Sequence, residues 1–125
     1  RSSRFVNQVV LVGNERKFAA ALIVPNFEML ESYAKHKGIK PMSQSEFCKD
    51  ARIINLFERQ VAAATKDLAK FESVKKIALI ENEMTVESGE LTPTMKLKRR
   101  VIDEKYKDVI DQIYSDAENQ KPADV

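Results

Sequence analysis

VNQVVLV, residues Val6–Val12, and KFAAALIV, residues Lys17–Val24, are two apolar runs separated by the turn-forming segment Gly13–Arg16. Short β-branched and apolar runs on either side of a Gly/Asn loop predict an antiparallel hairpin that stops at Pro25. Because neither run alternates clearly between apolar and polar residues, we expect both faces of the sheet to be covered. The similar run VKKIALI, Val74–Ile80, is expected to add a third strand.

Between the second and third strands, the apolar spacing changes to that of helices. Asn26 is placed to cap a helix that Lys37-Gly38 would end, and Ser43–Glu46 has the spacing of a capping box. Asp50 would cap a third helix, and a last amphipathic helix is predicted over Val101–Tyr114. The inward face of the third helix is expected to comprise Ile53, Leu56, Phe57, Val61, Ala64 and Leu68. The expected fold is a small α+β domain, a hairpin plus one strand packed with helices.

The composition describes a single globular domain. The 125 residues are 43% hydrophobic and 32% charged, which suits one packed core. The 21 basic and 19 acidic residues leave a formal charge of only +2, which argues against a general polyanion binder. Cys48 is the single cysteine, so no internal disulfide forms and a reducing, cytoplasmic setting fits. The chain opens like a piece of a longer protein, and residues 116–125 are expected to form a frayed tail.

Several kinds of site have no support in the sequence. His36 is the only histidine and Cys48 the only thiol, so we expect no metal site. Both are interpreted as ordinary helix residues, with Cys48 packed and inert. The three glycines do not have the spacing of a phosphate-binding loop. The acidic pairs at 81–83 and 103–104 are interpreted as solvated surface.

A cationic cluster near the last helix is the strongest functional signal. GELTPTMKLKRR, residues 89–100, places Lys96, Lys98, Arg99 and Arg100 within five positions. Cations at a helix start oppose the helix dipole, so a nearby anion would explain them better than helix stability does. Lys96 precedes the helix, on a loop that follows Thr92, Pro93 and Thr94, and Pro fixes one backbone dihedral there. Spacing alone leaves three interpretations open: a solvated helix end, a nucleic-acid patch, or delivery of Lys96 to a reacting group.

The segment Phe71–Arg100, FESVKKIALIENEMTVESGELTPTMKLKRR, resembles the end of long-chain fatty acyl-CoA synthetases, members of the adenylate-forming superfamily. The similarity extends over roughly residues 5–115, and LTPTMKLKRR is its most specific part. In most branches of that superfamily the final motif reads Ser-Gly-Lys, then an apolar residue and basic ones. The motif lysine falls on Lys96, followed by Leu97 and the basic residues. Met95 replaces the motif glycine, a departure typical of the long-chain branch.

The resemblance implies a two-step ligase. A fatty acid and Mg-ATP would form an acyl-adenylate and pyrophosphate, and coenzyme A would then displace AMP. Residues 1–125 would be the mobile C-terminal domain, truncated at its N-terminus, and its partner would be the enzyme's own N-terminal AMP-binding domain. That missing domain would hold most of the ATP and Mg²⁺ contacts, so the isolated fragment is expected to be inactive. The full-length enzyme is expected in the cytoplasm, with peripheral membrane association left open.

The resemblance gives Lys96 the role of the adenylation lysine. Thr92, Pro93 and Thr94 would support its loop, and Lys98 and Arg99 are weaker candidates for phosphate or coenzyme A contacts. The alternatives are a ligase for another carboxylate, a structural partner domain, and a nucleic-acid-binding or interaction module that uses KLKRR. The near-neutral charge and the lack of interleaved aromatic residues argue against nucleic acid.

Overall fold

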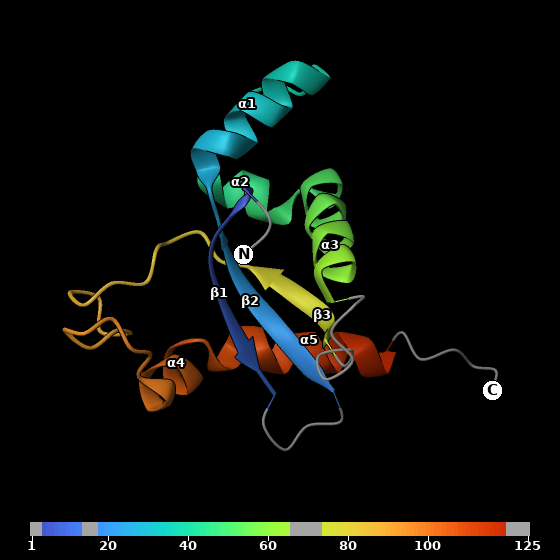
Figure 1. The fold of residues 1–125 in the computed structure, drawn as a ribbon. Helices are drawn as coiled ribbons and strands as arrows, with labels where there is room; N and C mark the ends of the chain where they lie inside the picture. The colour runs from blue at the N-terminus through green and yellow to red at the C-terminus, as the bar shows by residue number, and fades with distance from the viewer. Residues whose placement is uncertain (1–3, 14–17, 66–73, 120–125) are drawn as a thin grey trace. The chain divides into compact units, whose positions relative to one another are not determined.

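The computed structural model describes residues 4–13, 18–65 and 74–119 (Figure 1). The chain forms two compact units, residues 1–83 and residues 84–125. The first unit contains the sheet and three helices, and the second contains the cationic cluster and the last helices.

The sheet of the first unit has three strands in the order β1-β2-β3. β1 (Val6–Val12) pairs antiparallel with β2 (Ala19–Pro25), and β2 pairs parallel with β3 (Val74–Leu79). The hairpin and the added third strand are therefore confirmed, as is the α+β class. The predicted turn lies outside the described residues from 14 to 17, and so does Lys17, the expected start of the second strand.

Helix α1 (Phe27–Lys37) begins and ends as its capping residues predict. The side chain of Asn26 accepts a hydrogen bond of 3.2 Å from the backbone N–H of Met29. Gly38 closes the helix in the left-handed conformation, with φ 74°. Both ends of α1 are therefore fixed by local residues.

The next two helices also follow local signals. α2 (Gln44–Lys49) has a full capping box between Ser43 and Glu46. α3 (Ala51–Thr65) follows Asp50, whose carboxylate accepts a 2.8 Å hydrogen bond from the backbone N–H of Arg52.

The core of the first unit lies between the sheet and its helices. Ile53, Leu56 and Phe57 are buried on α3 and Val61 is packed against them, as predicted. Two predicted positions are not described: the side chain of Ala64 and the whole of Leu68. The buried cluster is Phe5, Ala21, Ile23, Leu30, Ala34, Phe47, Ile53, Leu56 and Phe57.

The prediction that both faces of the sheet are fully covered is wrong for β1. β2 is almost completely buried, but on β1 Val9 is 53% exposed and Leu11 is 39% exposed. Val9 pairs with Ile23 and Leu11 with Ala21, so these side chains share the sheet face on which the core lies. α2 and α3 pack against β3, at the opposite edge of the sheet, which leaves this part of β1 uncovered within the described structure.

The second unit contains a loop and two helices, α4 (Arg99–Lys105) and α5 (Lys107–Asn119). The single helix predicted over Val101–Tyr114 is therefore wrong in one respect, because it is interrupted at Tyr106. The backbone of Tyr106 leaves the helical region, with φ −105° and ψ 19°. Its side chain takes part in a tertiary hydrogen bond that apolar periodicity does not report. Residues 120–125 of the expected tail lie outside the described residues, and α5 continues to Asn119.

Candidate functional site

Residues 91–97 form a small hairpin that carries Lys96 at its end. Leu91 and Leu97 form an antiparallel bridge, and the backbone N–H of Thr92 donates to the carbonyl of Lys96 at 2.8 Å. The N–H of Met95 donates back to the carbonyl of Thr92 at 2.7 Å and closes a four-residue turn. The loop between Thr92 and Lys96 is thus only three residues long.

Met95 adopts a backbone conformation that normally favours glycine. Its φ is 67°, and it is the non-glycine residue with positive φ in the described part of the chain. Three-residue hairpin loops commonly require one left-handed residue at this point. Because the side chain of Met95 is 64% exposed, packing does not hold it there. A glycine would adopt this conformation without the steric cost of a side chain.

The two threonines hydrogen-bond within the same turn. The hydroxyl of Thr92 accepts a 3.1 Å hydrogen bond from the backbone N–H of Lys96, and it shares a second one, also 3.1 Å, with the hydroxyl of Thr94. Pro93 lies between them, where it limits the backbone. The structure therefore brings Thr92, Pro93, Thr94 and Lys96 together in one ordered loop.

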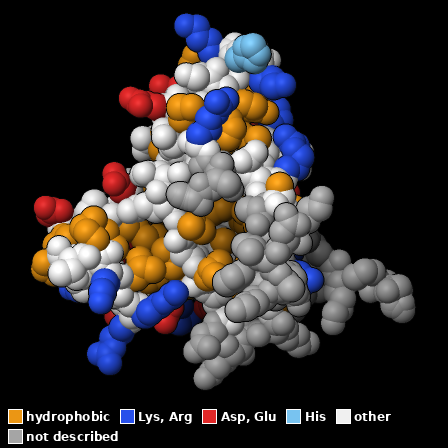
Figure 2. Space-filling view, viewed as in Figure 1, with side chains coloured by type: hydrophobic (Ala, Val, Ile, Leu, Met, Phe, Trp, Pro, Cys, Tyr) orange, Lys and Arg blue, Asp and Glu red, His pale blue; other side chains and the backbone are white. Residues whose placement is uncertain are grey.

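The four residues of the cationic cluster are all exposed. Lys96 is exposed, and no acidic side chain in the described residues forms an ion pair with it. Lys98 is the residue before α4 and makes no side-chain capping bond, while Arg99 and Arg100 begin the helix and are exposed. Figure 2 shows Lys and Arg side chains gathered over the region where Figure 1 labels α4. A protruding lysine can reach a group outside its own domain.

Glu90 is a buried acid at the base of this hairpin that no local sequence pattern predicts. The residue has no exposed surface. One carboxylate oxygen accepts from Lys105 at 2.5 Å and from the hydroxyl of Tyr106 at 3.1 Å, and the other accepts from the hydroxyl of Ser88. The backbone carbonyl of Glu90 accepts a 2.8 Å hydrogen bond from the N–H of Lys98.

These contacts keep Glu90 ionised. Burial alone would raise the pKa of its carboxyl group, but hydrogen bonds from Lys105, Ser88 and Tyr106 outweigh it and lower the pKa to about 2. Burial and the neighbouring carboxylate together raise the pKa of Tyr106 to about 12. At neutral pH the site therefore holds the carboxylate of Glu90 and the neutral phenol of Tyr106.

A second turn orders the chain just before Glu90. The backbone N–H of Thr85 donates to the hydroxyl of Ser88 at 3.0 Å, and the N–H of Ser88 donates to the hydroxyl of Thr85 at 2.9 Å. The N–H of Leu91 reaches the carbonyl of Thr85 at 3.3 Å. Ser88 thus links this turn to the carboxylate of Glu90. Glu90 does not stand out in the sequence, because its partners Lys105 and Tyr106 are 15 and 16 residues away.

The other chemical candidates have ordinary surroundings. His36 is exposed near the end of α1. Burial, with a smaller contribution from the charge of Glu81, raises the pKa of the Cys48 thiol to about 11, which disfavours the reactive thiolate. Within the described ranges, no group of three His, Cys, Asp or Glu residues is placed to hold a metal ion. None of the described helices is long and apolar enough to cross a membrane.

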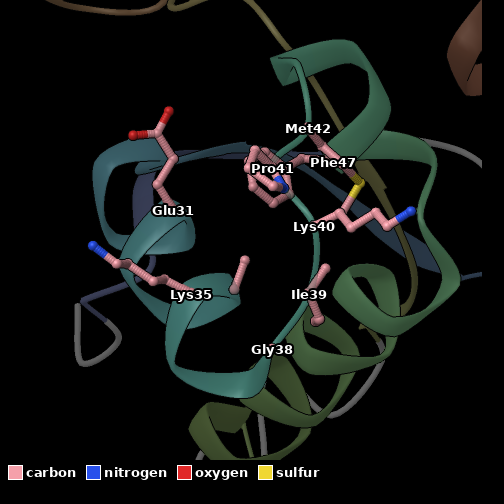
Figure 3. Close-up of a pocket in the computed structure, with 9 residues that line it drawn as sticks. Glu31, Lys35, Gly38, Ile39, Lys40, Pro41, Met42 and Phe47 are labelled. Carbon is pink, nitrogen blue, oxygen red and sulfur yellow. The ribbon is translucent and has the colours of Figure 1, made fainter.

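A pocket in the first unit has an apolar lining. It has a volume of about 680 Å³ and lies between the end of α1 and the segment that leads into α2 (Figure 3). Pro41 and Phe47 are among its lining residues, and the charged ends of Glu31, Lys35 and Lys40 point away from the middle of the view in Figure 3. The pocket therefore presents no converging polar groups of the kind that orient a substrate.

Comparison with known proteins gives a consistent result. Residues 1–118 match the family model of the AMP-binding enzyme C-terminal domain. The chain is 32% identical over 117 residues to Long-chain-fatty-acid–CoA ligase FadD15 of Mycobacterium tuberculosis, with 92% of this chain and 19% of that protein covered. It is 34% identical over 113 residues to Long-chain-fatty-acid–CoA ligase 1 of Cavia porcellus, with 88% and 16% covered. The chain thus spans about a fifth or less of the length of these relatives.

Solved structures share the fold. The adenylation domain of a carboxylate reductase from Mycobacterium chelonae aligns with a TM-score of 0.59 at 30% identity, covering 89% of this chain and 16% of that one. The A-PCP didomain of carboxylic acid reductase from Segniliparus rugosus, solved with AMP, aligns with a TM-score of 0.71 at 16% identity, covering 95% and 15%. At that identity the second match is evidence of the fold alone.

Proposed function

Because the chain belongs to the family of AMP-binding enzyme C-terminal domains, we propose that it is the C-terminal domain of an ATP-dependent long-chain fatty acid–CoA ligase. In the first half-reaction, a fatty acid carboxylate attacks the α-phosphate of Mg-ATP, forming an acyl-adenylate as pyrophosphate leaves. In the second, the thiol of coenzyme A attacks the acyl carbonyl, its proton is lost, and AMP leaves. The long-chain substrate is proposed because both of these relatives are long-chain-fatty-acid–CoA ligases.

Lys96 supplies positive charge to the first half-reaction. The carboxylate and the α-phosphate oxygens are both anionic, so a cation between them lowers their repulsion and stabilises the transition state. At ~4 Å and an effective dielectric near 20, one charge pair contributes about 4 kcal/mol, which corresponds to roughly a thousandfold in rate. The exposed position of Lys96 on a short, hydrogen-bonded hairpin is the single observation that carries this proposal.

The remaining parts of the machinery lie in the rest of the polypeptide. The proposed partner of residues 1–125 is an N-terminal AMP-binding domain that holds most of the ATP, Mg²⁺ and coenzyme A contacts. Movement of the C-terminal domain would bring Lys96 to the nucleotide for adenylation and withdraw it for thioester formation. Lys98 and Arg99 directly follow the Lys96 hairpin and would attract the phosphates of ATP or coenzyme A. Without its partner domain, the chain is expected to make no acyl-CoA.

Substitution of Lys96 tests the proposal. In the full-length enzyme, Lys96→Ala should slow acyl-adenylate formation by roughly a thousandfold, while thioester formation from supplied acyl-adenylate stays within about twofold. Pyrophosphate release and acyl-CoA formation measure the two steps separately.

Lys49→Ala is a matched control, because it removes the same exposed ammonium group from α2 in the other unit. It should leave both steps unchanged. Equal losses in both half-reactions of Lys96→Ala would assign the lysine a structural role, and normal adenylation would remove it from the mechanism.

A further inference from the structure

We propose that Glu90 is a positioning residue for adenylation, because it ties the base of the Lys96 hairpin to the junction of α4 and α5. The inference rests on the function proposed above and adds a residue to it. Because Glu90 is buried, it would act by fixing the position of Lys96 rather than by contacting substrate.

The contacts of Glu90 reach both sides of the hairpin. Glu90 directly precedes Leu91, the first residue of the bridged pair, and its carbonyl accepts the N–H of Lys98, which directly follows the second. The backbone of Glu90 therefore closes the base of the hairpin through Lys98, which is two residues from Lys96. The ladder continues toward the tip through the hydrogen bond between Thr92 and Lys96.

The side chain of Glu90 connects that base to the helices. Its carboxylate binds the ammonium of Lys105, the last residue of α4, and the hydroxyl of Tyr106, where the helix is interrupted. A third donor, Ser88, comes from the preceding turn. A single buried carboxylate thus joins three segments of the second unit, and its loss would release the hairpin from the helices.

A purely stabilising role fits this arrangement less well. Lys105 is 44% exposed, and an ion pair with a solvent-screened partner generally adds little net stability. Hydrogen bonds to a carboxylate do impose directional contacts, and Glu90 makes three. Catalysis by a positioned charge is sensitive to geometry, since a displacement of about 1 Å can cost about a hundredfold in rate.

Glu90→Gln in the full-length enzyme tests the proposal. The amide keeps the size of the side chain but removes the charge that holds Lys105. Adenylation should fall by about a hundredfold, whereas thioester formation from supplied acyl-adenylate should change by less than about threefold. Amide exchange at Lys98 should also accelerate. Equal losses in both half-reactions would overturn the proposal in favour of a structural role.

Glu104→Gln is the matched control, because it makes the same chemical change at an exposed residue next to Lys105. It should leave both half-reactions unchanged. Lys105→Met should reproduce the adenylation loss, and Lys105→Arg should recover much of it because the cation is retained. The double variant Glu90→Gln/Lys105→Met should be no slower than the worse single variant, as expected for two groups that act through one contact.

The outcomes separate this inference from the proposed function. If Lys96→Ala stops adenylation but Glu90→Gln does not slow it, the role of Glu90 is rejected and that of Lys96 stands. If Lys96→Ala has no effect, both proposals fail. Should Glu90→Gln not fold, Tyr106→Phe removes one hydrogen bond only. It should slow adenylation selectively by about tenfold, and the absence of a selective effect would reject the proposal.

Discussion

At the scale of single residues, Met95 offers a direct test of the hairpin geometry. Its positive φ is costly for side chains branched at Cβ, and its exposure means that substitution removes little packing. Met95→Val should therefore destabilise the hairpin by about 1 kcal/mol, which corresponds to about fivefold faster exchange of the Thr92 amide. Met95→Gly should keep the amide at least as well protected. Hydrogen exchange measured by NMR compares the variants.

Equal protection in the valine and methionine forms would show that the left-handed turn is not what holds the loop. Thr94→Val serves as a control, because it introduces the same side chain at the preceding position, which does not have positive φ. The Thr94 variant loses its hydroxyl contact with Thr92 and should show only a small change.

The residues of the site differ in how far the sequence can predict them. Lys96 stands in a local motif, LTPTMKLKRR, and these ten neighbouring residues are enough to propose its role. Glu90 is recognised only after folding, because its partners Lys105 and Tyr106 are distant in the chain and each is an ordinary helix residue in sequence. A buried acid leaves no local pattern when its counter-ion comes from another element.

At the scale of elements, the connection between the hairpin and the helices should depend on pH. Glu90 has a folded pKa of about 2, below the ordinary value of 4.5, so its contribution to stability is present above about pH 5 and is lost as the pH falls toward 2. Because Lys105 is 44% exposed and solvent screens the pair, the loss should be on the order of 1 kcal/mol. Urea unfolding of the second unit, followed through its NMR amide signals, measures it.

Tyr106 sets the opposite limit. Its pKa is raised from 10 to about 12, so its contribution to stability is present below pH 10 and declines as the pH rises toward 12.

Glu90→Gln is the control for the acid limit. It should flatten the acid part of the plot of stability against pH, since the variant has no carboxyl group to protonate. An acid dependence that survives in this variant would have to come from another group.

The helices also show where apolar periodicity stops being sufficient. Local caps at Asn26, Ser43 and Asp50 fixed three helix starts correctly, because their hydrogen bonds involve neighbouring residues. The apolar spacing across Tyr106 correctly predicted an inward face, since Ile102, Tyr106 and Ile110 are all buried. It could not predict the interruption, which coincides with a hydrogen bond to a residue outside the helix.

At the scale of the whole molecule, the strands of the sheet could be predicted from the sequence, but their burial could not. The apolar runs predicted three strands, and the short connection predicted that the first two are antiparallel. Whether a strand is covered depends on which part of the sheet the helices pack against, and tertiary packing decides this. Two largely apolar strands therefore differ: β2 lies at the centre and is buried, whereas β1 lies at an edge and leaves Val9 and Leu11 partly exposed.

Two leucines allow this difference to be measured with the same substitution. Leu30 has no exposed surface and belongs to the core of the first unit, whereas Leu11 is 39% exposed on β1. Leu30→Ala should lower the free energy of unfolding by about 2–5 kcal/mol, because it removes packed methyl groups and leaves a cavity. Leu11→Ala should cost no more than about 1 kcal/mol. Urea unfolding of residues 1–125 gives both values, and similar losses would mean that β1 is covered in solution after all.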